Sequence, residues 1–144
     1  MTIKQLSIFV ENKPGAMYSM TKVLSDNGVN MKALSMAETK DFGIVRIIVD
    51  DLYKATTILK EAEYVHTLTP VLAVAIPDTP GGLNKVLEVL YEANTTVEYM
   101  YAFLGGKSTD SAYMIFRVAD TAAAAAALSV QGIKTVCQDE IAKL

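Results

Sequence analysis

The sequence predicts an α+β fold made of two copies of one small βαββαβ unit. The prediction depends on an internal repeat, on short β-rich segments that alternate with helical ones, and on a composition that permits a packed core. The chain has 144 residues, of which 51% are hydrophobic and 20% are charged. This length suits one ordinary domain or two very small ones. The repeat therefore decides the organisation of the chain.

The two halves align when the sequence is shifted by 66 positions, which places Pro14-Gly15 on Pro80-Gly81. After a four-residue lengthening at Gly105–Ser108, the match resumes to the end of the third predicted strand. Identity is low, but apolar positions and turn residues coincide over most of both halves, which indicates a structural repeat. We therefore predict two domains, residues 1–68 and 69–144.

Each element of the first repeat has a local reason. Short segments rich in β-branched residues predict strands. Pro14 lies where the first turn of a helix tolerates proline, and Gly28 supplies the left-handed residue that ends this helix. Asp50 is the predicted N-cap of the second helix. The predicted strands are 3–10, 31–38, 43–49 and 64–68, and the second helix is 52–62.

The second repeat shows the same order of elements. Leu83, Leu87 and Leu90 have the spacing of a core-facing helical stripe. The run Ala122–Ala127 predicts a helix because alanine has the highest helix propensity, and Asp120 is its predicted N-cap. Two helices on one face of a four-stranded antiparallel sheet make each unit ferredoxin-like. The predicted strands are 71–76, 97–104, 113–118 and 133–136.

Composition and charge exclude several classes of function. The net charge is −3 and the basic residues are scattered singly, which argues against a nucleic-acid or anionic membrane partner. One cysteine, Cys137, and one histidine, His66, argue against a metal site and against Ser–His or Cys–His catalysis. No apolar run approaches the roughly 18 residues of a membrane helix, and the first residues lack signal-peptide features. We expect a cytoplasmic protein that is not an enzyme and needs no cofactor.

The turn after the first strand carries a family resemblance. Residues 11–15 read Glu-Asn-Lys-Pro-Gly and precede an apolar helix and the sequence Gly-Val-Asn-Met at 28–31, while residues 78–83 form a less faithful second copy. The pattern resembles the ACT domain, an amino-acid-sensing module attached to many enzymes of amino-acid metabolism, and is similar to the serine-sensing ACT domain of phosphoglycerate dehydrogenase. The two copies cover essentially the whole chain. The resemblance therefore implies a regulatory protein that binds a free amino acid.

The chemistry of the turn supports such a ligand without reference to the family. A Pro-Gly turn before a helix presents free backbone N–H groups where the helix dipole favours an anion such as a carboxylate. Small residues let a ligand approach the backbone closely, and Asn12 offers both a donor and an acceptor. The alternative interpretation is that these turns only lead the chain into a helix, and that Asn30 is an ordinary turn residue.

The resemblance also implies how two repeats pair. In the serine-sensing relatives, two domains join through their second strands into one eight-stranded antiparallel sheet with the helices on one face. The loop asparagine of one domain then shares a ligand with an asparagine that opens the second strand of the other. Side-by-side pairing of this kind would set Asn12 against Thr96 and Asp78, which could hold an ammonium group, against Asn30. These relatives carry a histidine where this chain has Val10, so serine is not the predicted ligand. The candidate binding residues are Asn12, Pro14, Gly15, Ala16, Met17, Asn30, Met31, Asp78, Thr79, Gly81, Gly82, Leu83, Thr96 and Val97.

The segment 97–104 predicts a second interaction surface. Alternation places Tyr99, Tyr101 and Phe103 on one face of this strand and apolar residues on the other. Helices cover only one side of a ferredoxin-like sheet, so we expect the open sheet face to pack against a second copy in a homodimer. The alternative is that these aromatic residues face a ligand or are modestly exposed.

The predicted function is that of a tandem regulatory protein that senses a free amino acid at the interface between two ACT repeats. Its regulated partner would be an enzyme of amino-acid metabolism. Two alternatives stay open: an interaction module that binds no ligand, and a small enzyme on the same scaffold. The enzyme is the less favoured of the two because no nucleophile and base stand out together in the sequence.

Overall fold

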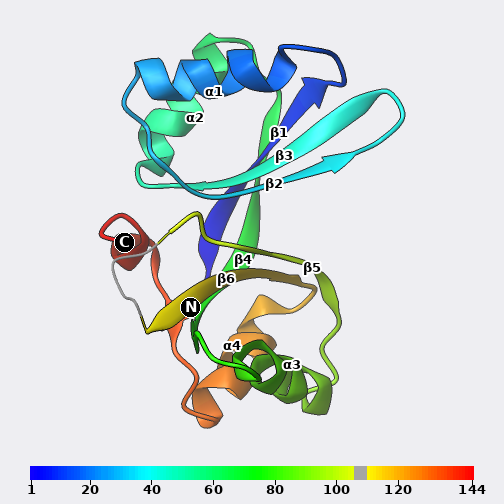
Figure 1. Ribbon diagram of the computed structural model, residues 1–144, viewed down its shortest axis with the longest axis vertical. Coiled ribbons are helices and arrows are strands. Elements are labelled where there is room, and N and C mark those ends of the chain that lie inside the picture. Colours follow the sequence, from blue (N-terminus) through cyan, green and yellow to red (C-terminus); the bar gives the residue numbers. More distant parts are fainter. Residues whose placement is uncertain (106–109) are drawn as a thin grey trace. The chain divides into compact units, whose positions relative to one another are not determined.

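The computed structural model describes residues 1–105 and 110–144, so most of the predicted lengthening at 105–108 lies outside the described residues. These residues contain seven strands and five helices (Figure 1). The chain divides into two compact units. We call Lys4–Thr69 the first repeat, and Met1–Ile3 together with Pro70–Leu144 the second repeat.

The first repeat is an antiparallel sheet with two helices packed on one face. Its sheet has the order β2-β3-β1-β4, to which β4 contributes its first part. Leu6 pairs with Ile47 across β1 and β3, and both side chains are fully buried under the helices. The core residues come from alternate positions of the strands, as expected for a sheet with one covered face. The elements are β1 (Ile3–Glu11), α1 (Ala16–Asp26), β2 (Met31–Glu38), β3 (Phe42–Val49), α2 (Leu52–Glu61) and β4 (His66–Pro77).

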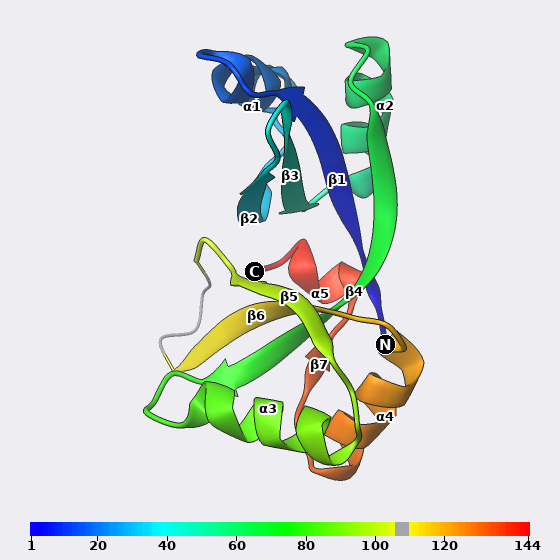
Figure 2. The ribbon, with the colours of Figure 1, turned by 90° about the vertical axis from the view of Figure 1, so that its right-hand side faces the viewer.

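The second repeat has the same architecture with one added helix. Its strand order is β7-β4-β6-β5, and α3 and α4 pack on one face over a core that includes Leu72, Phe116 and Leu128. The short α5 lies on the opposite face of this sheet (Figure 2). Sequence reasoning missed this last helix. The further elements are α3 (Gly82–Glu92), β5 (Val97–Ala102), β6 (Ser111–Val118), α4 (Thr121–Val130), β7 (Thr135–Val136) and α5 (Gln138–Ile141).

The fold class is confirmed as α+β with two ferredoxin-like repeats, but the strand count is corrected. Separate strands over 64–68 and 71–76 were expected, whereas β4 is one continuous strand that serves both repeats. Pro70 does not interrupt it, because its extended backbone suits a strand and its carbonyl accepts a hydrogen bond from Arg117 Nη1 at 2.9 Å. The described residues therefore form seven strands where eight were predicted. β2 and β5 are each the edge strand of their own repeat, and pairing through them stays a prediction.

The helix caps correct the alignment of the repeats. Asp120 caps α4 as predicted, by accepting from the Ala123 N–H at 3.0 Å. The prediction of Asp50 as the cap of α2 is wrong, because Asp51 accepts from the Lys54 N–H at 2.9 Å. Two consecutive aspartates leave the cap ambiguous in the sequence. The pairing of Asp51 with Asp120 shifts the second half of each repeat by 69 positions, so the lengthening is three residues instead of four.

Candidate ligand-binding site

The turns that precede α1 and α3 have the same geometry. Gly15 and Gly81 are the N-cap residues, with φ values of 85° and 86° in the left-handed region. Residues with a Cβ adopt this conformation only with strain, which explains the glycine at both places. Neither cap residue makes a side-chain hydrogen bond to its helix. The Ala16 and Gly82 amides donate to the Lys13 and Thr79 carbonyls at 3.3 and 3.0 Å. What each turn can offer a ligand is therefore the other N–H groups of the first helical turn.

A cavity of about 450 Å³ lies beside the turn of the first repeat. Of the predicted binding residues, Pro14, Gly15 and Ala16 line it. Asn12, Met17, Asn30 and Met31 are not among its lining residues. The remaining lining residues, which sequence reasoning missed, are Phe9, Val10, Glu11, Lys13, Ser19, Glu63, Tyr64 and Val65.

The second repeat has a corresponding cavity of about 590 Å³. The predicted residues Thr79, Gly81 and Gly82 line it. Asp78, Leu83, Thr96 and Val97 are not among its lining residues. Sequence reasoning missed most of the residues that line the rest of this cavity. They include Lys85, Asp110, Ser111, Gln131, Gly132, Ile133 and Lys134.

The two cavities occupy equivalent places because the segment after the second helix bonds to the first strand in the same way. The Phe9 N–H donates to the Val65 carbonyl at 3.0 Å, and the Ala75 N–H donates to the Lys134 carbonyl at 3.1 Å. A residue with positive φ, Glu63 or Gly132, begins this segment in each repeat. With the corrected shift of 69 positions, Glu63 aligns with Gly132 in the sequence, and the two segments that follow the second helices align with each other. Each cavity therefore lies between the glycine turn and the segment that leads out of the second helix.

The residues that open the second strands lie elsewhere. The Asn30 N–H donates to Asp50 Oδ1 at 3.0 Å, and the Asp50 N–H donates to the Asn30 carbonyl at 3.1 Å. These two bonds hold the start of β2, where Asn30 is exposed. Met31 lines a smaller hollow of about 370 Å³ together with the exposed face of α1.

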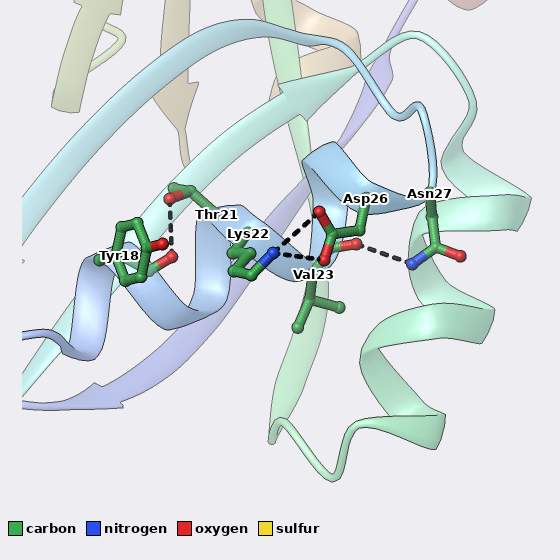
Figure 3. A network of polar contacts seen from close by, with 6 residues as sticks. All are labelled: Tyr18, Thr21, Lys22, Val23, Asp26 and Asn27. Atoms are coloured by element: carbon green, nitrogen blue, oxygen red, sulfur yellow. Dashed lines mark hydrogen bonds and ion pairs between the residues drawn. The ribbon is translucent and has the colours of Figure 1, made fainter.

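Polar side chains on that face of α1 are engaged within their own helix (Figure 3). Lys22 Nζ forms an ion pair with Asp26 Oδ2 at 2.8 Å, and Thr21 Oγ1 donates to the Tyr18 carbonyl at 3.2 Å. Asn27 Nδ2 donates to the Val23 carbonyl at 2.8 Å beyond the end of the helix. Three residues of this hollow, Thr21, Lys22 and Asp26, therefore already have partners. We regard the two glycine-turn cavities as the candidate sites.

Comparison with known proteins identifies the family. The family model that describes an ACT domain pair matches residues 1–144. The chain belongs to the ACT domain pair family. Among the part of the chain that the structure describes, no three His, Cys, Asp or Glu side chains cluster in a way that could hold a metal ion. Nor does any described helix have the length and apolar character needed to cross a membrane.

Several solved structures resemble this ACT domain pair over most of its length. A protein from Bacteroides thetaiotaomicron is 35% identical, with a TM-score of 0.91 over 100% of this chain and 98% of that chain. The ligand-free regulatory subunit of aspartate kinase from Thermus thermophilus is 16% identical, with a TM-score of 0.59 over 88% of this chain and 89% of its own. The regulatory subunit of aspartate kinase from Thermus flavus is 17% identical, with a TM-score of 0.54 over 88% and 90%. The two Thermus proteins bear on the fold alone. No curated protein sequence gave a match.

The ACT domain pair carries an ion pair that joins the second cavity to α5. Lys134 Nζ lies 2.8 Å from Glu140 Oε1, and the Cys137 N–H donates to Glu140 Oε2 at 2.9 Å. These contacts, first the hydrogen bond from Lys134 and then that from the Cys137 backbone, lower the pKa of Glu140 from 4.5 to about 2. In turn, the hydrogen bond with the Glu140 carboxylate raises the pKa of Lys134. Ile141 of α5 is fully buried, so α5 is held by this side chain as well as by the ion pair of Glu140 with Lys134.

Acidification is expected to loosen α5. Because the folded-state pKa of Glu140 lies below its ordinary value, its contribution to stability is present above about pH 4.5 and is lost as the pH falls towards 2. Hydrogen exchange at the Ile141 amide, corrected for intrinsic rates, should show less protection at pH 3 than at pH 6. The Glu140→Gln variant should show the loose state at both pH values. Equal protection in the wild type at both pH values would contradict the expectation.

The aromatic residues of β5 face away from α3 and α4. Tyr101 pairs with Ile115, whereas Met100 pairs with the core residue Phe116. The Tyr99 and Tyr101 rings stack with their centroids 6.5 Å apart, and Tyr101 is only 9% exposed. The expectation that helices lie on one face alone is incomplete, because α5 lies on this same side of the sheet (Figure 2). Packing of a second copy on this face stays a prediction.

Proposed function

We propose that this ACT domain pair is a cytoplasmic, non-catalytic regulator that binds a free amino acid at its glycine turns and controls an enzyme of amino-acid metabolism. The observation that carries the proposal is the pair of uncapped helix starts, each behind a left-handed glycine and each opening on a cavity. Such a turn offers backbone amides to the carboxylate that all free amino acids share. Regulatory subunits of aspartate kinase have the same fold, and we extend a regulatory role to this chain as part of the proposal.

The proposal extends to the way in which an ACT repeat completes its site. β2 and β5 are edge strands, so each presents unpaired backbone groups to another ACT repeat. Pairing through them would bring Asn30 or Thr96 of one repeat to the turn of another, where Asn12 or Asp78 lies. The open sheet face would then hold two copies together as a homodimer. Binding of the amino acid would favour the paired state, and this difference in affinity is what a regulated enzyme would detect.

Calorimetry of the full chain with each of the twenty amino acids tests the proposal. We expect one amino acid, or a few of related structure, to bind with a Kd in the micromolar to millimolar range, since a few charge-assisted hydrogen bonds each contribute about 1.5–3 kcal/mol. A ligand at 100 times its Kd should also raise the free energy of unfolding by about 2.7 kcal/mol. Sedimentation at micromolar concentration checks the homodimer. No heat with any amino acid would favour an interaction module that binds no ligand.

Replacing Asn30 with alanine tests the pairing of strands separately from binding. If a second repeat completes the site, Asn30→Ala should weaken binding while the fold, held at this point by the backbone bonds to Asp50, stays intact. Asn27→Ala is a matched control, because Asn27 is an exposed asparagine whose side chain donates to the Val23 carbonyl of its own helix. Equal affinity of both variants and the wild type would count against pairing through the second strands.

A further inference from the structure

The linings of the two glycine-turn cavities differ in charge. Of the described residues, two glutamates and one lysine line the first cavity, whereas two lysines and one aspartate line the second. These residues are Glu11, Glu63 and Lys13 in the first cavity, and Lys85, Lys134 and Asp110 in the second. The second cavity is therefore the more favourable place for a ligand that carries an additional negative charge.

The difference in charge arises at equivalent positions of the two repeats. The shift of 66 positions applies to the first helix of each repeat, and the shift of 69 positions applies to the segment after the second helix. The corresponding pairs are Ser19 and Lys85, Val65 and Lys134, and Glu63 and Gly132. At each of these places the second repeat is more positive by one charge. Because the glycine turns themselves are alike, the side chains around them distinguish the two cavities.

Lys85 is the cation that the second cavity can offer to an anion. Among the ion pairs in the part of the chain that the structure describes, none includes Lys85. This lysine is exposed, and its backbone N–H donates to the Gly81 carbonyl at 3.1 Å, which places it one helical turn after the glycine. By contrast, Lys134 is paired with Glu140 at 2.8 Å, and Asp110 also has a partner already.

In the first cavity, a neighbouring carboxylate already neutralises the lysine. Lys13 Nζ lies 2.7 Å from Glu11 Oε2. Glu63 adds a second carboxylate to the same lining. Because like charges repel one another at short range, an anionic side chain of a ligand would be disfavoured in this cavity.

We propose that the second repeat binds an amino acid whose side chain carries a second carboxylate, of the aspartate and glutamate class, with Lys85 on that side-chain carboxylate. This inference rests on the proposed function, which it deepens by naming the class of amino acid and the repeat that binds it. The remaining N–H groups of the first turn of α3 suit the α-carboxylate that all amino acids share, which leaves the lysine for the second one. Asparagine and glutamine have nearly the same shape but lack the second charge, so they lose this partner.

Calorimetry of the full chain with aspartate, asparagine, glutamate and glutamine tests the inference. The wild type should bind at least one of the two acids about tenfold more tightly than the matching amide, because the acid gains a charge-assisted bond. Lys85→Gln should raise the Kd of that acid about tenfold and so abolish the preference, while Lys85→Arg should keep it. Lys60→Gln is the matched control and should leave the preference unchanged. Lys60 is an exposed lysine on the last turn of α2 and is not among the residues that line either glycine-turn cavity.

The outcomes separate this inference from the function on which it rests. If the wild type binds other amino acids but prefers neither acid to its amide, the inference is wrong while the proposed function stands. The inference is also wrong if Lys85→Gln keeps the preference, or if Lys60→Gln loses it to the same extent. If the wild type binds none of the twenty amino acids, the proposed function and the inference both fail. Circular dichroism of each variant, compared with the wild type, checks that the fold is retained.

Discussion

The Phe116→Ala variant should lose about 3–5 kcal/mol of the free energy of unfolding. Phe116 is fully buried in the core of the second repeat and pairs with Leu72 on β4 and with Met100 on β5. Removal of the ring takes away its transfer free energy and leaves a void between the sheet and α4, which the surrounding structure fills only in part. Urea unfolding followed by circular dichroism measures the loss as a lower midpoint.

The alanines of α4 explain why this ring matters. Position 47 of the first repeat, which corresponds to Phe116, is Ile47, and it faces α2, where Ile58 contributes to the core. The position that corresponds to Ile58 in α4 is Ala127. A larger residue on the strand thus compensates for a smaller one on the helix, as close packing requires. The second core therefore depends on one ring for volume that two aliphatic residues share in the first.

Tyr91→Ala is the control for this prediction. Tyr91 is also an aromatic residue of the second repeat, but its side chain is 82% exposed. Surface substitutions of this kind usually change stability by no more than about 0.5 kcal/mol. A similar fall in the urea midpoint for both variants would show that Phe116 does not have the packing role that its burial indicates.

Much of the fold could be predicted because its signals are local. The order of the elements follows from β-rich segments, the helical stripe of α3 and the glycines and prolines at the turns. That β4 is one strand could not be predicted, because a proline such as Pro70 usually indicates the end of a strand. The hydrogen bond from Arg117 to the Pro70 carbonyl joins residues that are distant in the sequence. The α5 helix escaped notice for a similar reason. Its N-cap is Cys137, an uncommon residue for that role, although Glu140 three positions later completes a capping box.

The candidate site could be predicted only where it is continuous in the sequence. The glycine turns were found because a short motif recurs in both repeats. Lys85 lies just beyond the motif, and Asp110 and Lys134 come from segments that meet the turn only through the hydrogen bonding of β4 with β6 and β7. Residues that a sheet brings together from distant segments leave no fixed spacing in the sequence. Conversely, Asp78 was predicted because it adjoins the turn in the sequence, but it is not among the residues that line the cavity.

The Gly82→Ala variant should lose about 1–3 kcal/mol of stability, although alanine is the better helix former. A Cβ added to Gly82 overlaps the Pro77 carbonyl oxygen and lies 3.3 Å from the carbonyl carbon. Both are backbone atoms at the end of β4, so the start of α3 or the end of the strand must move. The gain in helix propensity is at most about 1 kcal/mol, and the overlap exceeds it. Thermal unfolding measures the net effect.

Gly105→Ala is the matched control, because it makes the same substitution where no atom of residues 1–105 or 110–144, apart from its chain neighbours, lies within 4 Å of the added Cβ. Its unfolding temperature should equal or slightly exceed that of the wild type, and an equal result for Gly82→Ala would contradict the proposed overlap. The first repeat carries Ala16 at the position of Gly82, so its turn already accommodates a Cβ. The turn of the second repeat is therefore the more tightly closed of the two. Because Gly82 also lines the cavity beside Lys85, a shift that relieves the overlap should weaken binding of the amino acid as well as stability.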